Sequence, residues 1–401
     1  AMSDCIYFDN NATTRIDEAV VEAMLPYLTT FYGNPSSMHS FGGQVGRATK
    51  QAREQVAALL GADDTEIVFT SCGTEGNNAA IRAALQAQPN KRHIITTQVE
   101  HPAVLNVCKL LEKKGYSVTY LSVNGEGQID LDELAASLTD DTALVSMMYA
   151  NNETGVIFPV EAAGAMVKER GATFHVDAVQ AAGKVPFDLK NSTIDLLTLS
   201  GHKLHAPKGI GALYVRRGVR FRPLLIGGHQ ERGRRGGTEN VPGMVALGKA
   251  AELARAALPN VEEERQLRDR LEWNILASIP NTAINGDPVH RLPNTTNIGF
   301  KYIEGEAILL SLDKYGICAS SGSACTSGSL EPSHVLRAMG LPYSVLHGSI
   351  RFSISRYTTE AEVDRVLEVL PEVVERLRLL SPFDSDEAGW LQEQEKAALT
   401  H

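Results

Sequence analysis

The sequence predicts an α/β protein with two parts: a large domain with a mainly parallel sheet between helices, and a smaller α+β domain at the carboxyl end. From about residue 17 to residue 255, short β-rich runs alternate with helical stretches, which is typical of a parallel sheet covered by helices. After Pro259 the pattern changes to a charged amphipathic helix followed by further strands and helices. With 401 residues, of which 43% are apolar, the chain is long enough for both parts.

The elements of the large domain follow from short apolar runs. Five such runs are predicted to be strands of the sheet: 66–70, 94–97, 144–148, 174–176 and 194–199. The two clearest helices between them are expected over 79–85 and 105–113. The run 144–148 is almost entirely apolar, as expected for a strand that is covered on both faces.

The smaller domain begins after the change in pattern. A helix over 262–277 carries Leu267, Leu271 and Ile275 on one face, and a last helix is expected over 360–380. We therefore predict a large domain over 17–255 and a small domain built from 1–16 and 256–381, which also carries the segment 319–330. The acidic and weakly patterned tail over 382–401 is expected to be mobile.

Charge and cysteine content narrow the functional classes. A formal net charge of −10 argues against a general affinity for nucleic acid or an anionic membrane, and no run approaches the length of a membrane-spanning helix. The amino terminus lacks the features of a secretory signal, so we expect a cytoplasmic protein. The five cysteines are scattered without CxxC spacing, so we expect thiols and no metal site.

Polar residues follow the predicted strands at their carboxyl ends, where open parallel sheets bind ligands. These residues are the segment 71–76, His101, the segment 151–155 and Asp177. The small residues and hydroxyls of 71–76 at a helix start could offer N–H groups to a phosphate. Each position taken alone has an ordinary structural interpretation, namely a helix cap, a structural histidine or a turn.

The segment 198–209 is harder to explain as structure alone. It places Lys203 directly after a buried strand, among Ser200 and two histidines. A Schiff base with an aldehyde cofactor needs a lysine whose neutral form is accessible, and burial favours that form. Ser200 and His202 can donate to a phosphate, and Asp177 is the candidate partner for a pyridinium nitrogen. The alternative, a lysine in a surface loop, is the weaker interpretation.

The segment 319–329 places Cys325 among serine, glycine and other small residues. Because nothing bulky could anchor this loop in a core, we expect it to be mobile, and a reactive thiol on such a tether could deliver a group. The alternative is a Ser/Gly linker with an incidental cysteine.

Nine motifs occur in order along the chain, up to about Pro382. They are FDNNATT (8–14), GNPSSMHSFG (33–42), EHPAV (100–104), NNETG (151–155), HVDAVQ (175–180), SGHKLHAPKG (200–209), GGHQERGRRGGTEN (227–240), SSGSACTSGS (320–329) and HGSIRFS (347–353). This ordered set resembles the cysteine desulfurases, which are fold-type-I pyridoxal-phosphate enzymes of the class V aminotransferase type. The residues of several motifs are most similar to those of the nitrogen-fixation member of that family.

The resemblance implies a role for each site residue. Lys203 forms the Schiff base with pyridoxal 5′-phosphate, Asp177 pairs with the pyridine nitrogen, and Gln180 contacts the phenolate oxygen. His101 lies against the ring as a proton donor or acceptor. The phosphate is held by Gly73, Thr74, Ser200 and His202, with Thr238 from a second subunit, which implies a homodimer. Arg351 and Asn152 bind the substrate carboxylate, a role for which the planar fork of arginine is suited, and Asn152 also contacts the cofactor.

The implied reaction converts L-cysteine to L-alanine and leaves a persulfide on Cys325. The implied sulfur acceptor is an iron–sulfur scaffold protein, with nitrogenase maturation as the expected pathway. Other assignments stay open: a housekeeping iron–sulfur desulfurase, and a selenocysteine lyase or aminotransferase of the same fold. A non-enzyme alternative is a cluster scaffold or metal carrier built on Cys318 and Cys325.

Overall fold

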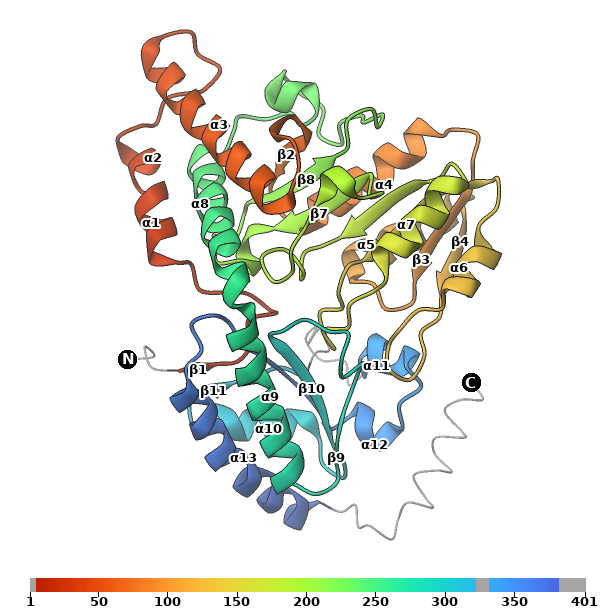
Figure 1. Cartoon of the computed structure of the whole chain (residues 1–401), viewed down its shortest axis with the longest axis vertical. Helices are drawn as coiled ribbons and strands as arrows, with labels where there is room; N and C mark the ends of the chain where they lie inside the picture. The colour runs from red at the N-terminus through yellow and green to blue at the C-terminus, as the bar shows by residue number, and fades with distance from the viewer. Residues whose placement is uncertain (1–4, 322–331, 382–401) are drawn as a thin grey trace.

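A seven-stranded sheet forms the centre of the larger part of the molecule (Figure 1). The computed structural model describes residues 5–321 and 332–381. The strand order is β2 (Ile67–Thr70), β8 (Gly211–Val215), β7 (Leu196–Ser200), β6 (Thr173–Asp177), β5 (Thr142–Met148), β3 (His93–Thr97) and β4 (Ser117–Leu121). The strands from β7 to β4 are parallel, whereas β8 is antiparallel to both of its neighbours. The predicted fold class is therefore confirmed.

Helices cover both faces of this sheet. They are α1 (Glu18–Met24), α2 (Pro26–Thr29), α3 (Ser40–Leu60), α4 (Gly73–Ala87), α5 (Pro102–Lys113), α6 (Leu131–Ser137), α7 (Val160–Glu169) and α8 (Val241–Ala257). Helices α4 and α5 pack on one face with Val68, whereas α3, α7 and α8 pack on the other with Ile67 and Phe69. Alternate residues of one strand thus enter opposite cores, which explains why all four residues of β2 are buried.

The smaller part is built around two short sheets. An antiparallel sheet has the order β12 (Ser349–Ser353), β10 (Thr295–Phe300) and β9 (Thr282–Ile284), and β1 (Ile6–Tyr7) pairs in parallel with β11 (Ile317–Cys318). The helices here are α9 (Val261–Ser278), α10 (Gly305–Asp313), α11 (His334–Ala338), α12 (Tyr343–Leu346) and α13 (Glu360–Leu380). Phe8 joins Phe300 and Phe352 in a separate hydrophobic core. The exact division of the chain into domains stays a prediction.

Five short 3-10 helices connect these elements. They are η1 (Asp64–Glu66), η2 (Leu189–Asn191), η3 (Gly201–Lys203), η4 (Gln230–Gly233) and η5 (Leu258–Asn260). Among the described residues, none of the helices combines the length and the apolar character that crossing a bilayer requires.

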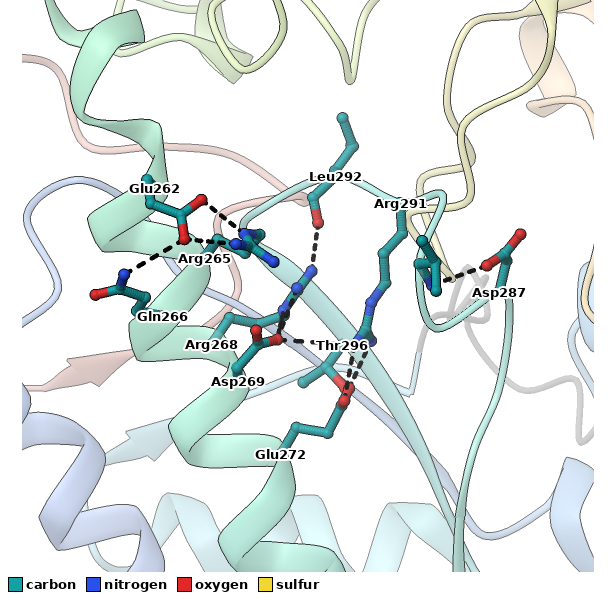
Figure 2. Close-up of polar contacts among 11 residues, drawn as sticks. Glu262, Arg265, Gln266, Arg268, Asp269, Glu272, Asp287, Arg291, Leu292 and Thr296 are labelled. Atoms are coloured by element: carbon teal, nitrogen blue, oxygen red, sulfur yellow. Dashed lines mark hydrogen bonds and ion pairs between the residues drawn. The ribbon is translucent and has the colours of Figure 1, made fainter.

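A buried network of charges fixes α9 to the segment that leads into β10 (Figure 2). Arg291 forms a two-pronged pair with Glu272, and its Nη2 lies 2.7 Å from Oε1 of that residue. Thr296 donates to the same carboxylate, and Arg268 Nη1 donates to the carbonyl oxygen of Leu292 at 2.7 Å. Arg268, Glu272 and Arg291 are buried, so removing one partner of these pairs would leave an uncompensated charge in the interior. The network therefore connects α9 to the start of β10.

Several predicted boundaries match the structure closely. Helix α13 has the predicted bounds, and α9 buries Leu271 and Ile275, with Leu267 packed beside them. Helix α4 begins six residues before the predicted start at residue 79, because its first turn consists of small polar residues without apolar spacing. Strands β4 and β8 were not among the predicted strands; β4 is only partly buried and carries several polar side chains.

Candidate active site

The carboxyl end of β7 meets the first turn of α4. A Cβ atom on Gly73 would lie 2.9 Å from Val179 Cγ2 and 3.5 Å from Ser200 Cβ, so only glycine allows this close approach. Thr74 follows Gly73 and is exposed, whereas Ser200 is buried. Free N–H groups at the start of a fifteen-residue helix form a cradle that suits a phosphate.

Asp177 ends strand β6 and is held by two hydrogen bonds. Asn77 of α4 donates from Nδ2 to Asp177 Oδ2 at 2.9 Å, and the Val179 backbone donates to Oδ1 at 3.0 Å. The carboxylate is buried, so its direction is set by these donors rather than by water. Asn77 was not among the predicted site residues, because an asparagine inside a helix carries no recognisable signal.

Lys203 ends the short helix η3 and points its amine at the amino-terminal segment. Its Nζ donates to the carbonyl oxygens of Asn11 and Ala12, the second at 2.8 Å. Burial lowers the pKa of Lys203 to about 7, and the positive charges of Arg351 and Lys184 act in the same direction. Much of the amine is therefore neutral at neutral pH, which is the form that a nucleophile or base requires.

His202, next to Lys203 in η3, is neutral at physiological pH. Burial, together with the charges of Lys203 and Lys208, lowers the pKa of His202 to about 4, and its Nδ1 lies 3.1 Å from Thr13 Oγ1. His202 can therefore meet a ligand only through hydrogen bonds of a neutral ring.

His101 caps helix α5. Its Nδ1 accepts from the Ala103 backbone at 3.1 Å, so this nitrogen carries no proton and Nε2 is the nitrogen that bears one. The ring has an exposed side, but desolvation by the surrounding protein lowers its pKa; Asp177 opposes this shift, and the charges of Lys203 and His334 add to it. A neutral ring that bears its proton on Nε2 can donate it.

Gln180 contributes a buried acceptor. Its Nε2 donates to the Asn11 carbonyl at 3.0 Å, whereas its Oε1 is buried and has no hydrogen-bond partner in the part of the chain that the structure describes. An unpaired buried oxygen is costly, so a ligand hydroxyl or N–H at this place would be stabilised.

Arg351 lies in the middle of β12 and is only 4% exposed, so it is no surface ion pair. Its Nη1 donates to the Asn152 carbonyl at 2.9 Å, and its Nη2 donates to Asp9 Oδ1 at 2.8 Å. The backbone of Arg351 pairs with Ser320, whose carbonyl accepts at 2.6 Å. The chain that leads to Cys325 thus pairs with the backbone of Arg351, although Cys325 itself lies outside the described residues.

Thr238 lies in the segment between η4 and α8. It is exposed, three residues after Arg235, which forms a two-pronged ion pair with Glu75 of α4. The expected contribution of Thr238 from a second subunit stays a prediction.

Two buried carboxyl groups beside the site were missed by sequence analysis. Burial raises the pKa of Glu100 to about 8, with the charge of Asp177 acting in the same direction, and Met148 donates its backbone N–H to Oε1 at 2.9 Å. Burial also raises the pKa of Glu153 to about 7, and Ser333 donates its hydroxyl to this carboxyl. An isolated glutamate in a loop is exposed more often than buried, so no local pattern could have found them.

A cavity of about 780 Å³ adjoins Lys203 between the two parts of the molecule. Lys184, Glu264 and Arg356 contribute to its lining, whereas His101, Asp177 and Ser200 do not. The cavity therefore lies next to the site of His101, Asp177 and Ser200 and is distinct from it.

The sequence from residue 6 to residue 366 matches the family model described as aminotransferase class-V. The chain belongs to the class-V aminotransferase family. A cysteine desulfurase from Trichormus azollae is 77% identical over 392 residues, which cover 98% of both chains. Cysteine desulfurase NifS from Azotobacter vinelandii is 60% identical over 380 residues, which cover 94% of both.

Solved structures of class-V aminotransferase relatives have the same fold. A NifS-like protein superposes with a TM-score of 0.88 and 41% identity, and the match covers 93% of this chain and 100% of that one. A NifS-like protein from Rickettsia africae superposes with a TM-score of 0.81 and 34% identity, with the same coverage. The chain is thus a fold-type-I enzyme of this family.

The cofactor of this member of the class-V aminotransferase family is pyridoxal 5′-phosphate, and the described residues fit it. The cradle at Gly73 suits the phosphate, the fixed carboxylate of Asp177 suits the pyridine nitrogen, and the neutral amine of Lys203 suits the aldehyde. The unpartnered Oε1 of Gln180 also points to a ligand.

Proposed function

We propose that this enzyme is a cysteine desulfurase, which converts L-cysteine to L-alanine and holds the sulfur as a persulfide on Cys325. The observation that carries the proposal is the proximity of two groups. A half-buried amine with a pKa of about 7 at Lys203 lies close enough to the buried guanidinium of Arg351 for the charge of Arg351 to lower that pKa. An α-amino acid needs both groups, one for its carboxylate and one for its α-proton.

Arg351 and Asn152 bind and orient the substrate. The guanidinium of Arg351 is oriented by its two hydrogen bonds to Asn152 and Asp9. Its Nε has no hydrogen-bond partner among the described residues. A substrate carboxylate gains a charge-assisted pair here in a site that excludes water.

Lys203 moves the α-proton. Bound pyridoxal phosphate supplies the aldehyde that takes up the amino group and the ring that accepts electrons from the α-carbon. The neutral Nζ of Lys203 would accept the α-proton, and the Asp177 carboxylate would hold the nitrogen of the cofactor ring. His101, whose pKa is lowered by desolvation, would donate or accept a second proton.

Cys325 takes the sulfur. Its thiolate attacks the substrate sulfur, so an S–S bond forms while the C–S bond breaks, and the carbon side takes up a proton and leaves as L-alanine. Cys325 is five residues beyond Ser320, which pairs with Arg351, so the chain can reach up to about 17 Å from that point. That reach supports delivery of the thiol to the site and its return to an external acceptor.

A homodimer completes the phosphate site. Gly73, Thr74, Ser200 and His202 supply the phosphate donors from one subunit, and Thr238 adds its hydroxyl from the second. The exposure of Thr238 supports this arrangement, since a hydroxyl that serves another subunit must face outward.

The sulfur acceptor is an iron–sulfur scaffold protein, and the pathway is nitrogenase maturation. The 60% identity with NifS of Azotobacter vinelandii over 94% of both chains supports this pathway. Housekeeping cluster assembly is the second candidate, and the cytoplasm, where thiols stay reduced, is the expected compartment for both.

The variant Cys325→Ala tests the central step. We expect it to bind the cofactor and L-cysteine but to form neither alanine nor persulfide, while Cys5→Ala, which changes an exposed cysteine, keeps the wild-type rate. Alanine release by Cys325→Ala at the wild-type rate would show that the sulfur is taken elsewhere.

Product analysis separates the alternatives. An aminotransferase would form a keto acid from cysteine, a selenocysteine lyase would need no Cys325 for selenocysteine, and a cluster scaffold on Cys318 and Cys325 would gain charge-transfer bands with iron. A cysteine desulfurase forms alanine and, as purified, absorbs visible light that Lys203→Ala abolishes.

A further inference from the structure

Asn11 lies at the junction of the two parts of the molecule and is only 1% exposed. It belongs to the segment that follows β1, and all its polar atoms are engaged. Its Nδ2 donates to Thr295 Oγ1 at 2.8 Å and to the Asn152 carbonyl at 3.2 Å, and its Oδ1 accepts from Asn294 Nδ2 at 3.0 Å.

The main-chain carbonyl of Asn11, unlike its side chain, contacts the proposed catalytic lysine. Its carbonyl oxygen accepts from Lys203 Nζ and, at 3.0 Å, from Gln180 Nε2. Its N–H donates to Ser353 Oγ at 2.9 Å. One residue therefore connects two strands of the smaller part with two site residues of the larger part.

The side-chain anchors of Asn11 lie beside a buried network of charges. Asn294 and Thr295 stand at the start of β10, next to the segment that the buried pairs of Arg291 with Glu272 and of Arg268 with the Leu292 carbonyl connect to α9 (Figure 2). Because hydrogen bonds restrain the side-chain amide of Asn11 at both its oxygen and its nitrogen, they also restrain the peptide carbonyl next to it.

We infer that Asn11 is a positioning residue for Lys203: its side chain, held by Asn294 and Thr295, fixes the carbonyl oxygen against which the lysine amine is aligned. This inference rests on the proposed function, because it concerns the step in which Lys203 moves the α-proton. Displacement of a reacting group by about 1 Å costs on the order of a hundredfold in rate. A small shift of this carbonyl is therefore enough to matter.

The experiment compares Asn11→Ala with Asn10→Ala. Asn10 is the adjacent buried asparagine; its Nδ2 also bonds to the carbonyls of Tyr7 and Ser353, but nothing in the described structure connects its side chain to Lys203. Both changes remove buried hydrogen bonds at the same place in the fold, so both are expected to lower the melting temperature. Only Asn11→Ala should affect Lys203.

Two readouts follow Lys203 directly. In holoenzyme that also carries Cys325→Ala, NMR measures exchange of the α-hydrogen of L-alanine with D₂O, which needs the lysine but not the thiol. We expect Asn11→Ala to slow this exchange about 10- to 100-fold and Asn10→Ala to change it less than about threefold. In cofactor-free protein, labelling of Lys203 by an amine reagent should be several-fold faster in Asn11→Ala, because the amine loses its fixed acceptor.

Asn11→Asp replaces Asn11→Ala in both measurements if Asn11→Ala does not fold. It keeps the oxygen that accepts from Asn294 and loses both Nδ2 bonds, so exchange should again be slower than in Asn10→Ala. Equal exchange and equal labelling in Asn11 and Asn10 variants would overturn the inference. If wild-type protein forms no persulfide but Asn11→Ala still slows exchange, the proposed function fails while the inference stands.

Discussion

Nη2 of Arg351 lies 2.8 Å from Oδ1 of Asp9, so the guanidinium proposed to bind the substrate carboxylate already holds a carboxylate. The pair is largely buried on the arginine side. A planar fork can serve two carboxylates at once, whereas a lysine ammonium is a single point charge. This difference makes the site testable by a conservative change.

We expect Arg351→Lys to raise KM for L-cysteine by about tenfold or more, because the bidentate geometry is lost while the charge remains. Steady-state alanine formation against cysteine concentration measures it. Arg365→Lys on α13, where the arginine pairs with Glu368 at the surface, is the control and should leave KM unchanged. An unaltered KM in Arg351→Lys would place the substrate carboxylate elsewhere.

Lys184 is half-buried, and desolvation lowers its own pKa to about 8; its Nζ donates to the Gln180 carbonyl at 2.9 Å. Its positive charge is one of the causes that lower the pKa of Lys203. Removing that charge in Lys184→Met should therefore raise the pKa of Lys203. The pH midpoint of Lys203 labelling in cofactor-free protein should move upward from about 7, whereas the exposed change Lys190→Met leaves it in place. A downward or absent shift contradicts the charge coupling.

Glu100 should make the folded protein less stable as pH rises. Its pKa is about 8 in the folded state against an ordinary value of 4.5, so it adds stability below about 4.5 that is lost as pH rises through 8. Glu100→Gln keeps an oxygen for the Thr97 and Met148 donors and cannot ionise. Its melting temperature relative to wild type should therefore increase steadily from pH 5 to pH 8.

The matched control for Glu100→Gln is Glu126→Gln, which changes an exposed glutamate. Its melting curve should follow the wild type at every pH. A difference between Glu100→Gln and wild type that does not depend on pH would mean that Glu100 is ionised in the folded protein.

Gly76 controls how closely α4 packs on β7. A Cβ atom there would lie 2.7 Å from Thr198 Cγ2, so Gly76→Ala should push the helix outward and cost roughly 1–3 kcal/mol. The phosphate cradle at Gly73 moves with it, so pyridoxal phosphate should bind about tenfold more weakly in titrations of cofactor-free protein. Gly43→Ala, a helical glycine with open space, should bind the cofactor as the wild type does. Equal affinity for pyridoxal phosphate in both variants would show that cofactor binding does not depend on the position of α4.

Local patterns were sufficient for much of the fold. The apolar run 144–148 predicted a strand buried on both faces, and the spacing of Leu267, Leu271 and Ile275 predicted the buried face of α9. The start of α4 was missed because its first turn lacks apolar spacing, and the antiparallel strand β8 was missed because it pairs with strands distant in sequence.

The candidate site divides in the same way. Lys203 and Asp177 could be named as candidates because Asp177 ends a strand, Lys203 comes three residues after one, and each has a residue type that the chemistry needs. Asn11 and Glu153 could not, because their importance comes from burial and from partners more than a hundred residues away. Lys184 could not either, because its charge acts on Lys203 in another element.

The sequence by itself determined the order of the elements, the residue types available for chemistry and the resemblance to a family, since these depend on neighbours along the chain. Only the tertiary structure decided which groups are charged and which atoms meet. Desolvation lowers the pKa of Lys203. Contacts between segments that lie far apart in the sequence give Arg351 its pair with Asp9 and Asn11 its bond to Lys203. Both effects depend on distance in space and not on spacing in sequence.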